Sequence, residues 1–164
     1  MKTLKLFCLP YAGGSASVYN PWKDHLDRSI QLVPVELAGR GSRIKEPLNT
    51  SRKEAVDDIY QIIRSDIENH PYMIFGHSMG ALMTFDLVHK IKVNNMPIPR
   101  HLFFSGASAP HLRDEKKKYH LMSPEEFEKE VRNLGGTPPE FFQHQELIDM
   151  FLPILKNDFK MAET

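Results

Sequence analysis

The sequence is poor in cysteine, in excess charge and in long hydrophobic runs. Its one cysteine, Cys8, excludes a disulfide within the chain and the paired spacing of a zinc site, so we expect a core residue. The 21 basic and 21 acidic residues cancel, which argues against a nucleic-acid-binding surface. Apolar stretches such as Leu6–Pro10 are far shorter than the ~20 residues that span a bilayer, and Leu4–Leu9 is too short for a signal peptide. We therefore expect a cytoplasmic protein that binds neither nucleic acid nor membrane.

The composition, 41% hydrophobic and 26% charged over 164 residues, is that of one folded domain. Short apolar runs alternate with amphipathic windows, which is typical of a parallel sheet with helices on both faces. The predicted strands are residues 4–9, 30–37, 72–75 and 101–105. The predicted helices are residues 17–29, which is a weak window, 51–70 and 79–92.

Local signals refine three of these elements. Pro34 favours an edge position or a bulge for the second strand. Ser51 and Glu54 have the spacing of a capping box, which predicts the start of the second helix. The third helix is expected to align Leu82, Phe85, Val88 and Ile91 on its buried face.

The pattern changes after Ser108, where a charged run precedes a purely helical region. Helix starts are predicted at Ser123–Glu126 and at Thr137–Glu140. A loose apolar stripe follows, and part of it is a candidate lining for a pocket. We interpret residues 112–159 as a helical lid inserted into the α/β domain.

The third strand runs directly into Gly76-His77-Ser78-Met79-Gly80, a G-x-S-x-G motif that a helix follows at once. This is the context of a nucleophile elbow, in which a strained turn lifts the serine hydroxyl clear of the sheet. The glycines are needed because side chains two residues from the serine would clash. Ser78 is therefore the candidate nucleophile, and the Met79 N–H is placed to stabilise an oxyanion.

A second glycine-rich loop, Pro10–Ala16, follows the first strand. It is either a simple flexible turn or a second source of oxyanion donors. In the second interpretation the backbone N–H of Ala12 points at the same oxyanion as that of Met79.

Together these motifs resemble the type II thioesterases of nonribosomal peptide and polyketide synthesis. The resemblance covers essentially the whole chain, through Leu9–Ala16, Glu36–Arg43, Phe75–Ala81, Phe104–Pro110, Leu134–Pro138 and Leu152–Phe159. It implies a single α/β-hydrolase domain over residues 1–164 that releases acyl groups from carrier proteins. Ser78 would be the nucleophile, Ala12 and Met79 the oxyanion hole, and residues 112–159 the lid. No cofactor or metal is implied, because the phosphopantetheine arm belongs to the carrier protein.

The base that should activate Ser78 has no obvious candidate. In this fold the acid and the histidine follow the serine, and in the family they lie beyond the lid. We therefore expect a C-terminally truncated member that lacks the last strands, turns over little, and has an exposed sheet edge prone to association. His77, His111 and His120 are weak substitutes, and Asp158 matches a lid-exit segment rather than the triad acid.

Several cations have two interpretations. Arg40 and Arg43 could contact a phosphate or a carrier carboxylate, or could be loop residues and structural ion pairs. Lys116–Lys118 could meet an acidic carrier helix, although a solvated lid surface is favoured. Two other functions stay open: a non-catalytic carrier-binding module, and a generic serine carboxylesterase.

Overall fold

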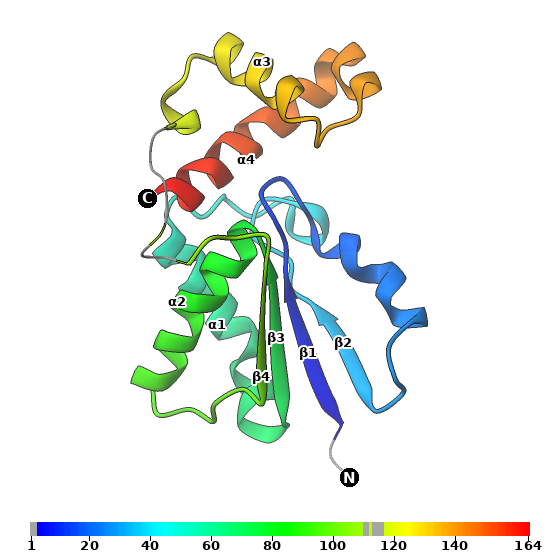
Figure 1. The fold of residues 1–164 in the computed structure, drawn as a ribbon, viewed down its shortest axis with the longest axis vertical. Coiled ribbons are helices and arrows are strands. Elements are labelled where there is room, and N and C mark those ends of the chain that lie inside the picture. Colours follow the sequence, from blue (N-terminus) through cyan, green and yellow to red (C-terminus); the bar gives the residue numbers. More distant parts are fainter. Residues whose placement is uncertain (1–2, 110–111, 113–116) are drawn as a thin grey trace.

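The computed structural model describes residues 3–109, 112 and 117–164, and its centre is a four-stranded sheet. All strand pairs are parallel, in the order β2-β1-β3-β4 (Figure 1). The strands are β1 (Leu4–Leu9), β2 (Ile30–Pro34), β3 (Tyr72–His77) and β4 (His101–Ser105). The four predicted strands are confirmed, and β2 has the edge position that Pro34 predicted. Because the strands are parallel, their carboxyl ends share one edge of the sheet.

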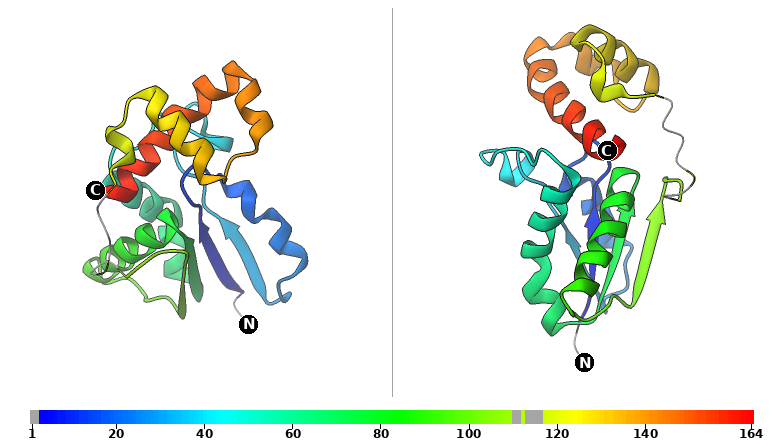
Figure 2. Two further views of the ribbon diagram at one scale, coloured as in Figure 1. Left: turned by 45° about the horizontal axis from the view of Figure 1, so that its top comes forward. Right: turned by 90° about the vertical axis from the view of Figure 1, so that its left-hand side faces the viewer.

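One face of the sheet carries helices α1 (Arg52–Asn69) and α2 (Met79–Val93), which lie side by side in Figure 2. Their apolar side chains form the main core with inward-facing strand residues such as Phe7 and Ile74. The opposite face packs Leu6 and Cys8 against the 3₁₀ helix η1 (Ala16–Asp24). The prediction of helices on both faces is therefore refined, because a 3₁₀ helix replaces the α-helix expected at 17–29.

The ends of α1 lie where the local signals placed them. The Ser51 hydroxyl accepts a hydrogen bond from the Glu54 N–H at 3.2 Å, and the helix is capped at its other end by His70. The Glu54 carboxylate accepts from the N–H and hydroxyl of Thr50, and these bonds lower the pKa of the carboxyl. Ser51 thus caps the helix as predicted, while Glu54 bonds to Thr50.

The predicted buried face of α2 is confirmed only in part, since Ile91 is 0% exposed and Val88 packs against the main core. Phe85 is 39% exposed and Leu82 half-buried, whereas Met83, Thr84 and Leu87 are fully buried. A spacing of three residues rotates by about 300° around a helix, so such a stripe drifts by about 60° at each step. The buried face instead follows mixed steps of three and four residues, which keep one side of the helix on the sheet.

A smaller helical layer lies across the carboxyl edge of the sheet (Figures 1 and 2). It consists of η4 (Tyr119–Leu121), α3 (Pro124–Leu134), η5 (Pro139–Gln143) and α4 (Gln145–Glu163). The capping box at Ser123 and Glu126 is confirmed. The second predicted start yields only η5, and α4 continues to Glu163, past the predicted lid end at 159. We call residues 117–163 the helical cap.

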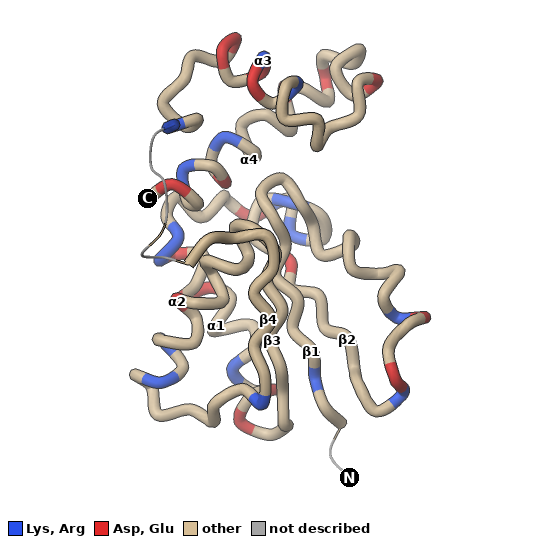
Figure 3. The backbone as a smooth tube through the Cα atoms, viewed as in Figure 1, with Lys and Arg blue, Asp and Glu red and all other residues tan. Residues whose placement is uncertain are grey.

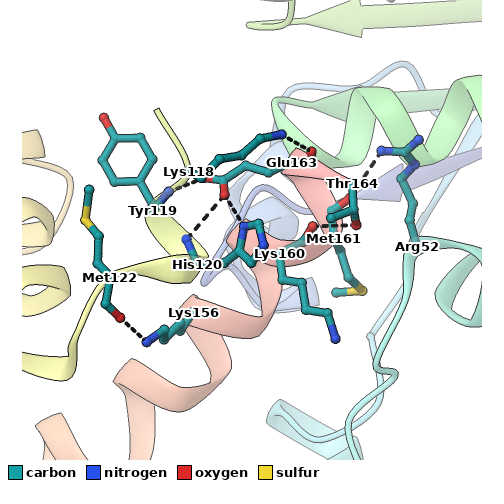
Figure 4. A network of polar contacts seen from close by, with 10 residues as sticks. All are labelled: Arg52, Lys118, Tyr119, His120, Met122, Lys156, Lys160, Met161, Glu163 and Thr164. Atoms are coloured by element: carbon teal, nitrogen blue, oxygen red, sulfur yellow. Dashed lines mark hydrogen bonds and ion pairs between the residues drawn. The ribbon is translucent and has the colours of Figure 1, made fainter. Parts of the chain in front are cut away.

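The two ends of the helical cap are held together by the Glu163 carboxylate (Figure 4). It accepts the N–H groups of Tyr119 and His120 at 3.0 and 3.2 Å, and it also contacts the His120 imidazole. Arg52 of α1 donates to the Met161 carbonyl oxygen at 3.2 Å. The Arg52 bond fixes the end of α4 to the α/β layer, and the Glu163 carboxylate gives His120 a structural partner.

Charges of both signs are spread over the surface of the described chain (Figure 3). Within the described residues, no helix is long and apolar enough to cross a bilayer. At the β4 edge Phe103 and Phe104 are 40% and 52% exposed, and association through this edge stays a prediction.

The Cys8 thiol is expected to be inert in the folded protein. It is 0% exposed, and burial raises its pKa from 9.0 to about 12, so the reactive thiolate is scarce at neutral pH. Alkylation by iodoacetamide at pH 8 should be roughly 100-fold slower in native protein than in guanidinium chloride. Equal rates in the two conditions would contradict this burial.

Candidate active site

Ser78 lies in a strained turn between β3 and α2, as the motif predicts. Its φ of 53° and ψ of −114° are unfavourable for a residue with a side chain. The turn is held by the Ser78 N–H, which donates to the Ser105 carbonyl oxygen at the end of β4 at 2.8 Å. Ser78 is thereby fixed at the carboxyl edge of the sheet and at the N-terminus of α2.

The two glycines of the motif are required by close backbone contacts. A Cβ atom on Gly76 would lie 2.2 Å from the Gly80 carbonyl oxygen. A Cβ atom on Gly80 would lie 2.3 Å from the Leu9 carbonyl oxygen of β1. The first turn of α2 therefore packs directly on the backbone of two strands, which is the steric reason that the sequence suggested.

The loop after β1 forms a tight turn over residues 11–14. The Gly14 N–H donates to the Tyr11 carbonyl oxygen at 2.9 Å, and Gly13 has a φ of 78°. A positive φ at the third position is the requirement of a type II turn, which places Ala12 at the second position. We call residues 11–14 the site turn.

A cavity of about 670 Å³ joins the site turn, Ser78 and the helical cap. Tyr11, Ala12, Gly13, His77 and Ser78 line its sheet side. Apolar side chains of the cap line the rest, namely Val131, Leu134, Pro138, Phe141, Phe151, Leu155 and Phe159. The structure thus brings two of the three predicted site residues to one apolar cavity.

Met79, the third predicted residue, has its side chain 1% exposed in the main core. Its backbone N–H belongs to the first turn of α2, where amides have no acceptor within the helix. Such an amide beside a serine is suited to an oxyanion. The oxyanion roles of Met79 and Ala12 stay predictions.

The candidate substitutes His77 and His120 contact groups other than Ser78. The His77 Nδ1 atom lies 3.0 Å from Ser105 Oγ, and its ring meets Tyr11 edge to face at 5.8 Å between centroids. His120 contacts Glu163, as described above, and His111 lies outside the described residues. Among residues 3–109, 112 and 117–164, we assign no base to Ser78.

A buried ion pair between Arg40 and Asp158 was missed from the sequence. The side chains are 5% and 0% exposed, and the guanidinium donates to both carboxylate oxygens at 2.5 and 2.6 Å. The Gly13 N–H donates to Asp158 Oδ2 at 2.7 Å. Arg40 is therefore a structural ion-pair residue, which is one of the two interpretations that the sequence left open. The sequence signal for this buried pair was the single carboxylate of Asp158 between Leu155 and Met161, on the apolar face of α4.

Arg43 and Lys117 are also paired with carboxylates, whereas Lys118 donates to the Glu163 carbonyl oxygen at 3.0 Å. Arg43 bonds Asp58 at 2.7 and 3.0 Å and also bonds Glu46, and these bonds raise the pKa of the guanidinium. Lys117 bonds Glu130 on the helical cap at 2.6 Å. Lys116 lies outside the described residues.

Substituting Gly80→Ala should destabilise the protein because the new methyl group would enter the backbone of β1. Overpacking of this kind costs about 1–3 kcal/mol, which would lower Tm by several degrees in a thermal melt. Gly136→Ala is the matched control, since a Cβ atom there would have nothing within 4 Å. Equal Tm values for the two variants would contradict the close packing of α2.

Comparison with known proteins supports one family. The thioesterase domain matches residues 4–164. The gramicidin S biosynthesis protein GrsT of Aneurinibacillus migulanus is 39% identical over 159 residues, which are 97% of this chain and 62% of that protein. The chain thus spans about three-fifths of the length of this curated relative.

Two solved structures have the same fold. ClbQ from the colibactin pathway superposes with a TM-score of 0.92 at 41% identity, covering 99% of this chain and 68% of that one. The RedJ thioesterase of prodiginine biosynthesis in Streptomyces coelicolor gives a TM-score of 0.88 at 34% identity, covering 98% and 63%. With its G-x-S-x-G elbow, parallel sheet and helical cap, the chain belongs to the thioesterase domain family.

Proposed function

We propose that the protein carrying this chain hydrolyses acyl thioesters held on the phosphopantetheine arm of a carrier protein. The proposal rests on one observation: the strained Ser78 opens into an apolar cavity that the helical cap covers. A serine at such a turn is suited to acyl transfer, and an apolar cavity is suited to an acyl chain.

In the proposed reaction, Ser78 Oγ attacks the thioester carbonyl carbon and loses its proton to a base. The tetrahedral oxyanion is stabilised by the backbone N–H groups of Met79 and Ala12, and one such donor is worth about 3–4 kcal/mol. The carbon–sulfur bond then breaks, the pantetheine sulfur leaves as a thiol, and an ester to Ser78 remains. Water hydrolyses this ester to a carboxylic acid and free Ser78.

The names of similar proteins favour a role in the synthesis of peptide or polyketide products, and the role proposed there is the removal of acyl groups from the carrier as an editing step. GrsT is a gramicidin S biosynthesis protein, ClbQ comes from a mixed peptide synthetase and polyketide synthase pathway, and RedJ is a thioesterase. A carrier protein is therefore the proposed partner. The proposed chemistry requires no cofactor of its own, because acyl transfer to serine needs only a base and oxyanion donors.

Ser78→Ala should abolish the reaction. We expect the protein to release free acid from an acyl-carrier thioester and the variant to be slower by roughly 10³-fold or more, because the acyl-enzyme cannot form. Release of acid is followed by mass spectrometry of the carrier. Undiminished release by the variant would contradict the role of Ser78.

The same assay separates the other two functions. A non-catalytic carrier-binding module would bind the loaded carrier with or without Ser78 and release no acid. A generic carboxylesterase would cleave small oxygen esters faster than carrier thioesters.

A further inference from the structure

The Arg40–Asp158 pair connects the helical cap to the site turn. Asp158 belongs to α4, and Arg40 lies in the loop after β2, far from it in sequence. We propose that these two are positioning residues that hold the site turn in its working conformation only while α4 is docked. This inference rests on the proposed function and concerns how the same site is regulated.

The central peptide bond of the site turn joins Ala12 and Gly13. Types I and II of a four-residue turn differ by a flip of this central peptide. The Gly13 N–H donates to Asp158 Oδ2 at 2.7 Å, so the carboxylate selects the type II orientation. Arg40 donates to the same Oδ2 atom at 2.5 Å and to the Gly14 carbonyl oxygen at 3.3 Å. The pair therefore holds the flipping peptide through its N–H group and the end of the turn through the Gly14 carbonyl oxygen.

Helix α4 packs closely on the site turn. A Cβ atom on Gly13 would lie 2.8 Å from Phe151 and 2.9 Å from Leu155, so the helix rests directly on this backbone. Phe151 and Leu155 also line the cavity. If α4 moved away, the turn would lose its carboxylate acceptor and its apolar cover together. The oxyanion donor expected at Ala12 would then lose its fixed direction.

The Arg40–Asp158 pair is poorly suited to stabilising the fold alone. Removing two charges from water costs several kcal/mol, and a buried pair recovers this only when all its polar atoms are satisfied. Arg40 Nε is buried without a hydrogen-bond partner in the described structure. An apolar pair could fill the same space, but it would offer no acceptor to the Gly13 N–H. The hydrogen bond to the Gly13 N–H of the site turn is therefore the contact that only the charged pair supplies.

Asp158→Asn keeps the shape of the side chain and removes its charge. We expect kcat for thioester hydrolysis to fall by roughly tenfold or more, with KM within about threefold, because an interaction of the transition state is lost. Asp66→Asn is the matched control, since Asp66 is paired with Lys5 of β1 and neither residue lines the cavity. A kcat for Asp158→Asn equal to that of the control would overturn the proposal.

The double variant Arg40→Met/Asp158→Leu separates positioning from stability. We expect its Tm to stay near or above that of Asp158→Asn while kcat stays low. Recovery of wild-type kcat in this variant would overturn the proposal, because an apolar pair cannot hold the Gly13 N–H.

A measurement that does not need turnover is the NMR signal of the Gly13 amide. In Asp158→Asn we expect an upfield proton shift and amide exchange faster by roughly tenfold, with no change in Asp66→Asn. An unchanged Gly13 amide would overturn the positioning proposal by itself. Failure of the wild-type protein to release acid, with the Gly13 response intact, would reject the proposed function and leave the positioning role supported.

Discussion

The close approach of α2 to the strand ends is the constraint on which the site depends. Gly80 lies against the Leu9 carbonyl oxygen of β1, and Gly76 lies against Gly80. This contact leaves no room for a gradual transition from strand to helix, so the turn must be made at Ser78 with a positive φ. Packing of the main core on both sides of the turn supplies the free energy that keeps this strained residue in place.

The site is completed by elements that are distant in sequence. The site turn comes from the end of β1, Ser78 from the end of β3, and the apolar cover from the helical cap. Parallel strands bring the first two to one edge, which is a property of the fold class. The cap is tied to the α/β layer by Asp158, which bonds Arg40 and the Gly13 N–H, and by the Met161 carbonyl oxygen, which accepts a hydrogen bond from Arg52.

Local features could be predicted from the sequence, because they depend on neighbouring residues. The caps at Ser51 and Ser123 and the steric need for Gly76 and Gly80 belong to this class. The buried face of α2 could not be predicted well, since it depends on which side of the helix the sheet occupies. Residues Thr137–Glu140 also signalled a helix start, but only the 3₁₀ helix η5 forms there, before α4 begins.

The Arg40–Asp158 pair shows why contacts between residues distant in sequence could not be predicted. The residues are 118 positions apart, and no periodicity links a loop arginine to one carboxylate on a distant helix. From the sequence, Arg40 has two interpretations and Asp158 is only part of a lid-exit segment. Only the tertiary structure shows that both are buried and that they meet at Gly13.

The most direct test of the account is to trap the covalent intermediate. An acyl-carrier thioester is mixed with the protein, the reaction is quenched in acid, and peptides are examined by mass spectrometry. We expect the mass of the acyl group on the peptide that contains Ser78, and we expect this added mass to be absent in Ser78→Ala. An acyl group found on another residue, with Ser78 unmodified during turnover, would contradict it.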